Sequence, residues 1–282
     1  METISVINRK GGVGKTTVST NLAAALAEYC GMRVLFIDND SQGNASSWFN
    51  ANSYDATITN IFLDGAKAED CIIPTRFTHE FFVQKYADQH RPYQFEQGHV
   101  DLIPADPGLD EVTPTLVLRQ KQDKLNNNSA LGKEDVLRKA LEGVQDKYDI
   151  CIIDNPPRSE EANTFNALVA SDEIIIITTS DAFGMSGLYQ MLAKIEKAKV
   201  HNPQLYLRGV LLNKYSKDNG SPLIEELKSK NIPVFKNHIR LTKARVDRST
   251  LEKKTIWEVS PRCGFALDIS KFIEEFVNPD EA

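Results

Sequence analysis

Long uncharged stretches are missing from this chain of 282 residues. No run of about 18 residues is free of charge, and no charged-then-apolar signal segment opens the chain, so neither a membrane span nor a secretory leader is predicted. Cysteine is also scarce, and none of Cys30, Cys71, Cys151 and Cys263 forms a C-x-x-C pair. This pattern predicts small, buried hydrophobic residues and argues against a cysteine-ligated iron–sulfur cluster. We therefore expect a cytoplasmic protein without a membrane partner.

An excess of positive charge is lacking as well. The 33 lysines and arginines face 39 aspartates and glutamates, which gives a net charge of -6. This balance argues against a protein built wholly to coat nucleic acid or anionic membrane, although it leaves room for a local basic patch. No composition break marks a linker, and the length fits one large α/β domain or two small ones.

A glycine-rich segment near the N-terminus carries most of the functional information. It reads K-G-G-V-G-K-T-T from Lys10 to Thr17, and it follows a strand-like run from Thr3 to Asn8. Glycines let several backbone N–H groups converge on a phosphate and approach it closely. In such a cradle Lys15 reaches the β- and γ-phosphates, and the hydroxyl of Thr16 holds Mg²⁺. The segment therefore predicts a nucleotide site.

Three motifs together resemble one family. K-G-G-x-G-K-[ST] is the deviant Walker A motif of the ParA/MinD-type ATPases, with Lys10 as its additional lysine. The segment from Asp38 to Asn44 is similar to the D-x-D-P-Q-G-N of ParA-type partition ATPases, with Ser41 in the proline position. The run from Tyr148 to Pro157 is similar to their Walker B strand, which ends in an aspartate, here Asp154. The resemblance is to the ParA (Soj-like) branch.

The hydrophobic pattern predicts the fold class. Strand-like runs alternate with amphipathic ones, and this alternation is typical of βαβ units and of a parallel sheet covered on both faces. The strand-like runs are 3–6, 33–37, 100–104, 150–153, 173–178 and 206–212, and the helix-like runs are 18–29, 185–199 and 222–230. We predict an α/β fold with a doubly wound, mostly parallel sheet flanked by helices. Ligands bind at the carboxyl ends of such strands, where all three motifs fall.

The resemblance adds detail to this fold. It implies a single P-loop ATPase domain over residues 1–282, with C-terminal helices at about 242–277. An aromatic-rich segment at about 75–100 matches the family poorly, and we expect a packed insertion there. Asn126 to Ser129 predict a turn before a helix that starts near Leu131.

The resemblance also assigns roles to side chains. The nucleotide-binding residues that it implies are Lys10, Gly11, Gly12, Val13, Gly14, Lys15, Thr16 and Thr17. Thr16, Asp38 and Asp154 are implied in Mg²⁺ binding, and Asp40 in orienting the attacking water. Lys10 is expected to cross a dimer interface to the partner's nucleotide, so that Lys10, Lys15 and Asp40 form the catalytic set. The expected activity is Mg²⁺-dependent hydrolysis of ATP to ADP and phosphate by an ATP-induced homodimer.

Base recognition is predicted from the end of another strand. The run from Val210 to Ser216 begins like the guanine-reading N-K-x-D of GTPases, but serine occupies the fourth position and Asp218 comes two residues late. A carboxylate there would not reach the guanine edge in the same geometry. In the ParA/MinD family an asparagine at this strand end contacts adenine, so the resemblance makes Asn213 the candidate for reading ATP.

One segment is strongly basic. Residues 236–254 hold seven basic residues against two acidic ones, which points to a polyanion, although a solvated helix surface is the alternative. In ParA-type proteins this region binds DNA without sequence preference. The candidate phosphate contacts are Arg245, Arg248, Lys253 and Lys254.

The implied function is that of a ParA-type partition ATPase. Such a protein dimerises on ATP, binds nonspecific DNA, becomes nucleoid-associated, and is stimulated by a centromere-binding, ParB-like adaptor, which drives segregation of plasmid or chromosomal DNA. The alternative is a MinD-like membrane or protein-positioning switch. That alternative predicts a basic amphipathic C-terminal helix, whereas this chain has acidic residues there. We expect its last helix to dock on the core through Phe272, Ile273 and Phe276.

Overall fold

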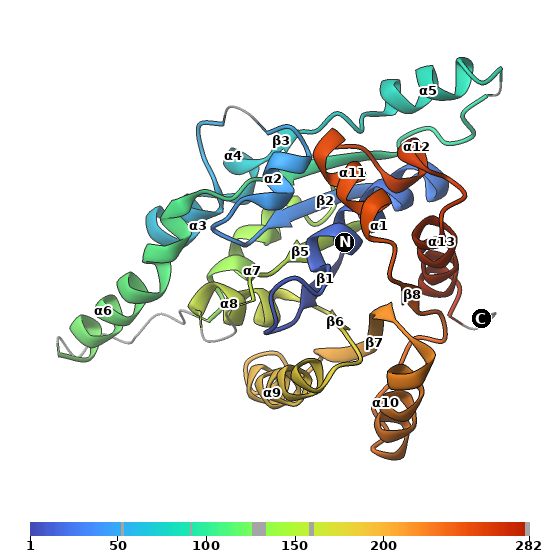
Figure 1. Cartoon of the computed structure of the whole chain (residues 1–282). Coiled ribbons are helices and arrows are strands. Elements are labelled where there is room, and N and C mark those ends of the chain that lie inside the picture. The colour runs from blue at the N-terminus through green and yellow to red at the C-terminus, as the bar shows by residue number, and fades with distance from the viewer. Residues whose placement is uncertain (52–53, 91, 126–133, 158–160, 280–282) are drawn as a thin grey trace.

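The described part of the chain forms one sheet of eight strands. A computed structural model describes residues 1–51, 54–90, 92–125, 134–157 and 161–279. The strand order is β3-β4-β2-β5-β1-β6-β7-β8, and every neighbouring pair is parallel except β3 and β4 (Figure 1). The bounds are β1 Glu2–Ile7, β2 Arg33–Asp38, β3 Ile73–Pro74, β4 His99–Ile103, β5 Ile150–Asp154, β6 Glu173–Thr178, β7 Tyr206–Tyr215 and β8 Ile239–Arg240. The predicted mostly parallel α/β sheet is confirmed.

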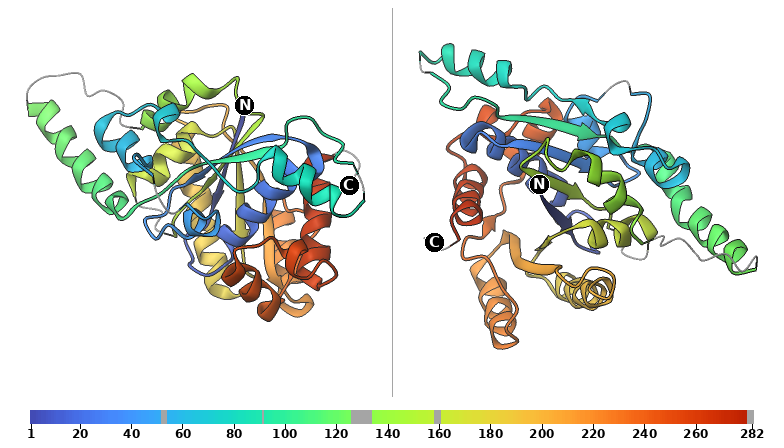
Figure 2. Two further views of the ribbon diagram at one scale, coloured as in Figure 1. Left: turned by 90° about the horizontal axis from the view of Figure 1, so that it is seen from above. Right: turned by 180° about the vertical axis from the view of Figure 1, so that it is seen from behind.

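Helices cover both faces of this sheet (Figure 2). They are α1 Lys15–Cys30, α2 Asn44–Trp48, α3 Ile58–Asp64, α4 Ala68–Cys71, α5 His79–Ala87, α6 Val112–Leu125, α7 Val136–Leu141, α8 Ala162–Ala170, α9 Ala182–Ala198, α10 Lys217–Ser229, α11 Lys243–Glu252, α12 Ile256–Val259 and α13 Gly264–Val277, with 3-10 turns at Pro107–Glu111 and Glu142–Val144. The turn expected at 126–129 lies outside the described residues.

Alternate residues of each central strand face opposite layers. Phe36 and Ile152 pack with α1 and α13 on one face, whereas Ile37 and Ile153 pack with α3 and α7 on the other. A third cluster joins β6 and β7 to α9 and α10. Because both faces are buried, the strands are apolar throughout, which is why they were recognisable as continuous hydrophobic runs.

The aromatic segment expected to be an insertion is anchored in the core. It leaves the sheet after β3 and returns as β4, while Phe77 and Phe82 are fully buried beside α1. The ammonium of Lys85 lies 2.6 Å from the buried carboxylate of Glu28, and the hydroxyl of Tyr93 donates to the carbonyl of Ala27. These contacts fix α5 against α1 at the periphery of the molecule (Figure 1).

The C-terminal helix α13 lies against α1. Phe272, Ile273 and Phe276 are 0%, 7% and 4% exposed, so the predicted docking of this helix is confirmed. In the part of the chain that the structure describes, no helix has both the length and the apolarity needed to cross a membrane. The cysteines are free; Cys71 and Cys151 are buried as predicted, whereas the other two are half-buried.

Candidate functional site

A cavity of about 790 Å³ opens where the three sequence motifs meet. The register places Asp154 beside Val6 on one side and beside Asp38 on the other, so the ends of β1, β2 and β5 converge. The cavity is lined by the P-loop, by Asp40 and Gln42 of the loop after β2, by the prolines after β5, and by the start of α11. The sequence-predicted residues are thus brought into one site.

The glycines of the P-loop and the start of α1 line this cavity. Gly12 and Gly14 have φ values of 71° and 94°, a left-handed conformation that glycine adopts without a Cβ penalty. Gly14 is the N-cap of α1 and makes no side-chain capping bond. Because the first amides of a helix have no intrahelical partner and the helix dipole is positive at this end, the N-terminus of α1 favours an anion in the cavity that it lines.

Lys15 lies at the floor of the site as a buried cation. Lys15 is 7% exposed, and among the described residues no carboxylate lies within ion-pair distance of its ammonium. Burial lowers the pKa of Lys15, and the negative charges of Asp154 and Asp40 oppose this shift. A buried ammonium without a partner is costly unless an anion binds it. Lys15 lines the cavity beside the P-loop glycines, and its contact with phosphate stays a prediction.

Thr16 and Asp154 form the part of the site that suits a divalent cation. The hydroxyl of Thr16 donates to Oδ2 of Asp154 over 2.6 Å, and Oδ1 of Asp154 is buried without a partner among the described residues. Burial, together with the charge of Asp38, raises the pKa of Asp154 to about 7. Hydroxyl and carboxylate oxygens are the ligands that Mg²⁺ prefers, so the residues present fit this ion.

Asp38 is engaged within the protein. Its Oδ2 accepts from the amide of Ser46 over 2.7 Å and from the hydroxyl of Ser46 over 2.8 Å, and its Oδ1 accepts from the amide of Asp40. The residue is fully buried, and burial raises its pKa to about 6. Asp38 thus anchors the loop that carries Asp40 and α2, while its contribution to the Mg²⁺ shell stays a prediction.

Asp40 occupies the cavity wall. Its Oδ1 accepts from the amide of Gln42 over 3.1 Å, and the side chain is half-buried. This residue lines the same cavity as Lys15 and Thr16. Its role in orienting water stays a prediction.

Lys10 points away from the chain's own phosphate cradle. Its ammonium lies 2.8 and 2.7 Å from the two carboxylate oxygens of Asp181, and 3.4 Å from the hydroxyl of Thr179. Sequence reasoning had not identified Asp181, because a carboxylate after a buried strand carries no motif of its own. Within a single chain, Asp181 therefore already pairs with the lysine that was expected to reach the nucleotide of the partner subunit.

Asn213 lies against the P-loop. Its Nδ2 donates to the carbonyl of Val13 over 2.7 Å, and its Oδ1 accepts from the amide of Lys214. Oδ1 keeps a second lone pair, so the contact with adenine stays a prediction. Lys214, which the sequence reasoning used only for the N-K-x-D comparison, donates its ammonium to the carbonyl of Gly12 and also lines the cavity.

The basic helix α11 forms one wall of the same cavity. Lys243 and Lys253 line it, and Arg245 is exposed nearby. The other two candidate DNA contacts are partly neutralised, because Arg248 and Lys254 lie 2.5 and 3.3 Å from the carboxylate of Glu252. Within the described ranges Lys243, Arg245 and Lys253 have no ion pair. The predicted patch therefore contains both free and compensated cations.

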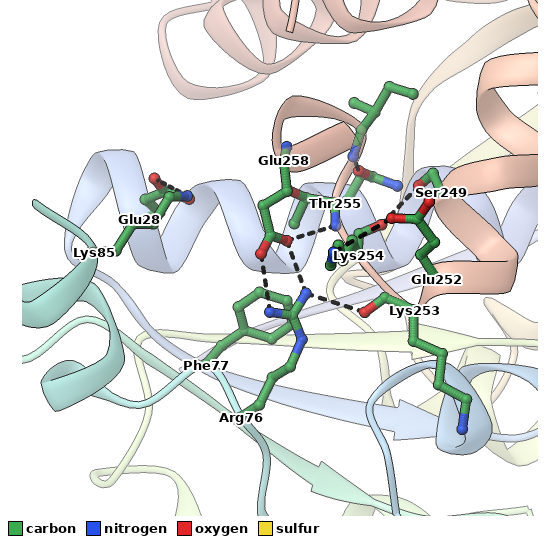
Figure 3. Close-up of polar contacts among 12 residues, drawn as sticks. Glu28, Arg76, Phe77, Lys85, Ser249, Glu252, Lys253, Lys254, Thr255 and Glu258 are labelled. Atoms are coloured by element: carbon green, nitrogen blue, oxygen red, sulfur yellow. Dashed lines mark hydrogen bonds and ion pairs between the residues drawn. The ribbon is translucent and has the colours of Figure 1, made fainter. Parts of the chain in front are cut away.

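Arg76 contacts the C-terminal end of α11, the helix that forms one wall of the cavity. Its guanidinium forms a bidentate pair with Glu258, donates to the carbonyl of Lys253 and lies 4.0 Å from the ring centroid of Phe77 (Figure 3). Glu258 also accepts from the amide of Thr255 in a capping box of α12. One side chain thus connects the aromatic segment to the turn between α11 and α12.

A buried asparagine network joins the motif loops, and the sequence analysis missed it. Nδ2 of Asn39 donates to Oδ1 of Asn155, and Nδ2 of Asn163 donates to the carbonyl of Asn39. All three are at most 2% exposed. The signal was present, since Asn39 and Asn155 each directly follow the aspartate that ends a buried strand. The network ties the loop after β2 to the turn after β5.

Comparison with known proteins gives a consistent result. A family model described as an AAA domain matches residues 1–207. The chain is 35% identical over 230 residues to the sporulation initiation inhibitor protein Soj of Bacillus subtilis. The aligned region covers 80% of this chain and 78% of that protein. It is 30% identical to the chromosome partitioning protein ParA of Caulobacter vibrioides, over 78% of this chain and 72% of that protein. A ParA family protein of Chlamydia pneumoniae is 30% identical over 98% of both chains.

Solved structures share the fold. Cobyrinic acid a,c-diamide synthase from Mycobacterium smegmatis, with bound ADP and magnesium, superposes with a TM-score of 0.74 at 22% identity, over 100% of this chain and 96% of that one. A putative plasmid partition protein from Borrelia burgdorferi bound to AMPPNP gives 0.73 at 21% identity, over 99% of each chain. At these identities the likeness concerns the fold alone.

Proposed function

This chain belongs to the ParA/Soj family of P-loop ATPases, and on that premise we propose that it is an ATP-dependent partition switch. In this proposal it binds Mg²⁺ and ATP, dimerises, attaches to DNA without sequence preference, and leaves the DNA after hydrolysis. A centromere-binding, ParB-like adaptor stimulates that hydrolysis, and the cargo is plasmid or chromosomal DNA. The protein is then cytoplasmic and nucleoid-associated while ATP is bound.

The observation that carries the nucleotide part of the proposal is the charge arrangement at the cavity floor. Among the described residues, no carboxylate lies within ion-pair distance of the ammonium of Lys15, a residue that is 7% exposed, and Oδ1 of Asp154 is buried without a donor. Both atoms are left incomplete by the protein alone, and a Mg²⁺–phosphate group completes both. Solved structures of similar fold contain ADP with magnesium or AMPPNP, and these ligands support the same assignment.

The chain's own residues have distinct parts in hydrolysis. The P-loop amides and Lys15 hold the β- and γ-phosphates, and Thr16 and Asp154 hold Mg²⁺, which supplies charge neutralisation on the phosphates. Asp40, on the cavity wall, orients the attacking water. Since phosphoryl transfer depends on positioning and charge stabilisation, a fixed geometry among these groups is the main catalytic requirement.

Dimerisation supplies the remaining charge. The ion pair between Lys10 and Asp181 is partly exposed to solvent, since the lysine side chain is 34% exposed and the aspartate side chain 46%. An exposed ion pair contributes only about 0.2–1 kcal/mol, so a partner's nucleotide can outcompete it. Hydrolysis then depends on two chains meeting.

DNA binding is assigned to the cations of α11. Lys243 and Lys253 lie at the rim of the nucleotide cavity, so nucleotide binding and dimerisation can alter how the helix is presented. A dimer also doubles the number of cations, and affinity for phosphates rises steeply with that number.

The test measures affinity for an arbitrary duplex with ATP, a slowly hydrolysed ATP analogue, ADP or no nucleotide, at two salt concentrations. The proposal expects salt-sensitive binding with ATP or its analogue only, and loss of that binding in Lys15→Ala. The matched control is Lys121→Ala, a change at an exposed lysine of α6. Binding that ignores nucleotide, or no binding at all, would remove the DNA step and favour a MinD-like positioning switch.

A further inference from the structure

Two consecutive residues at the end of β7 hold two consecutive carbonyls of the P-loop. Asn213 donates through Nδ2 to the carbonyl of Val13 over 2.7 Å. Lys214 donates through its ammonium to the carbonyl of Gly12, also over 2.7 Å. Both residues line the cavity beside the P-loop and hold the loop through these carbonyls.

Holding these carbonyls fixes particular amides. The carbonyl of Gly12 shares a planar peptide with the N–H of Val13, and the carbonyl of Val13 shares one with the N–H of Gly14. In a trans peptide the C=O and N–H groups point in opposite directions. A donor on each carbonyl therefore aims the two amides toward the cavity, which is the direction that phosphate binding requires.

The asparagine is itself held in place. Oδ1 of Asn213 accepts from the amide of Lys214 over 2.8 Å, and the residue is 5% exposed. A Cβ on Gly14 would collide with Nδ2 of this asparagine, so glycine at that position permits the close approach. The P-loop sequence and the end of β7 are complementary in shape as well as in hydrogen bonding.

Lys214 adopts a backbone conformation that favours glycine. Its φ is 54°, in the left-handed region, which residues with a Cβ seldom occupy. Glycine would fit this backbone without strain, but it could not offer an ammonium to Gly12. Strain of this kind is retained where the residue has a specific task.

We propose that Asn213 and Lys214 clamp the P-loop in its phosphate-binding conformation before nucleotide arrives, and that Lys214 is a positioning residue. The first two residues of the N-K run thus serve the phosphates, and Ser216 stands where the N-K-x-D motif has its carboxylate. This inference rests on the nucleotide site of the proposed function, but it does not depend on DNA binding or hydrolysis.

The test compares Lys214→Met, Lys214→Arg and Lys214→Gly with Lys217→Met as the matched control, since Lys217 is exposed on α10 and does not line the cavity. Calorimetry gives the affinity for Mg²⁺–ADP, so catalysis is not needed. We expect Lys214→Met to bind about 3- to 10-fold more weakly, where tenfold corresponds to about 1.4 kcal/mol. Lys214→Arg should restore most of this loss, and Lys217→Met should match wild type.

Lys214→Gly separates positioning from general stability. It relieves the strained backbone, so we expect a melting temperature at or above that of Lys214→Met together with the same weakened affinity. In the nucleotide-free protein, amide hydrogen exchange across residues 8–16 should be faster in Lys214→Met than in the control.

Two results would overturn the inference. One is an affinity and a P-loop exchange rate in Lys214→Met equal to those of wild type. The other is a loss of affinity in all variants that follows their melting temperatures, which would mark a purely structural residue. If wild type bound no nucleotide at all, the nucleotide site of the proposed function would fail and this inference with it, whereas failure of DNA binding alone would leave the clamp intact.

Discussion

The ammonium of Lys10 and the carboxylate of Asp181 form an ion pair within one chain, with a nearest N–O distance of 2.7 Å. Thr179 donates to the same carboxylate over 2.7 Å. Because the proposed partner-directed lysine is already paired in the single chain, dimer formation has to break this contact.

Removing the carboxylate should therefore favour the dimer. We expect Asp181→Asn to raise ATP-dependent dimerisation and hydrolysis by about 1.4- to 5-fold for each ion pair broken, the range set by the ~0.2–1 kcal/mol of an exposed pair. Sedimentation with an ATP analogue and steady-state phosphate release measure both. Glu69→Gln, which removes the exposed pair with Lys147, is the control. Unchanged dimerisation in Asp181→Asn would mean that the pair does not restrain Lys10.

Lys15→Met should have opposite effects on the free and bound protein. Burial without a partner disfavours the ammonium, so the nucleotide-free variant should melt at or above the wild-type temperature. Its affinity for Mg²⁺–ATP should fall about 100-fold, which corresponds to about 2.7 kcal/mol. Thermal scans with and without nucleotide check both parts, and a lower melting temperature of the free variant would contradict the assignment of Lys15 as an unpaired cation.

Asp154 should make stability depend on pH in a defined direction. Its pKa is raised from 3.8 to about 7 by burial, so its favourable contribution is present at low pH and is lost as pH rises through 7. Asp154→Asn should thus raise the melting temperature of the nucleotide-free protein more at pH 8 than at pH 5, at about 2–4 °C per kcal/mol. The same variant should lose Mg²⁺ affinity.

Asp149 provides the contrasting control for that experiment. Its hydrogen bond to Arg33 lowers its pKa, so Asp149→Asn should reduce stability at pH 8. If Asp154→Asn were also destabilising at pH 8, the hydrogen bond that Thr16 donates to this carboxylate would outweigh the cost of burying its charge.

Arg76→Gln should loosen the cavity wall. It leaves Glu258 with a 17% exposed side chain and no cation, so we expect a loss of about 1–3 kcal/mol in unfolding free energy. The double variant with Glu258→Gln should lose less than the sum of the single changes. Denaturant unfolding measures these values, and strict additivity would show that the pair is not coupled.

Glu252→Gln should strengthen DNA binding. Glu252 pairs with both Arg248 and Lys254, so its removal frees two cations for phosphates. We expect higher affinity for an arbitrary duplex in the ATP state and a steeper decline with salt. Glu225→Gln, at an exposed position of α10, controls for the change in net charge. Equal salt slopes for the two variants would place the DNA contacts elsewhere.

The fold and the cradle were predictable because their signals are local. Apolar strands of a doubly covered sheet are continuous in sequence, and the P-loop glycines occur within a few residues of Lys15. Thr16 and Asp154 could be placed together because the carboxyl ends of parallel strands share one edge. The register between the strands was not needed to place these two residues in one site.

The remaining features depend on pairings between distant segments. Asp181 lies 171 residues from Lys10, and Glu258 lies 182 residues from Arg76. No periodicity specifies such partners, and the charges in 236–254 could not be divided into free and compensated cations before Glu252 was placed. The sequence likewise did not show which aromatic side chains of the segment at about 75–100 pack in the core, as Phe77 and Phe82 do.

The grip of Asn213 on Val13 also sets an order of events during synthesis. The two residues are 200 positions apart, so a ribosome has to add 200 amino acids after the P-loop before its carbonyl finds its donor. A nascent chain that exposes only its first motifs therefore has the glycine-rich loop without the support of β7. The clamped form of the P-loop therefore arises late in translation, when most of the sheet is already available to fold around it.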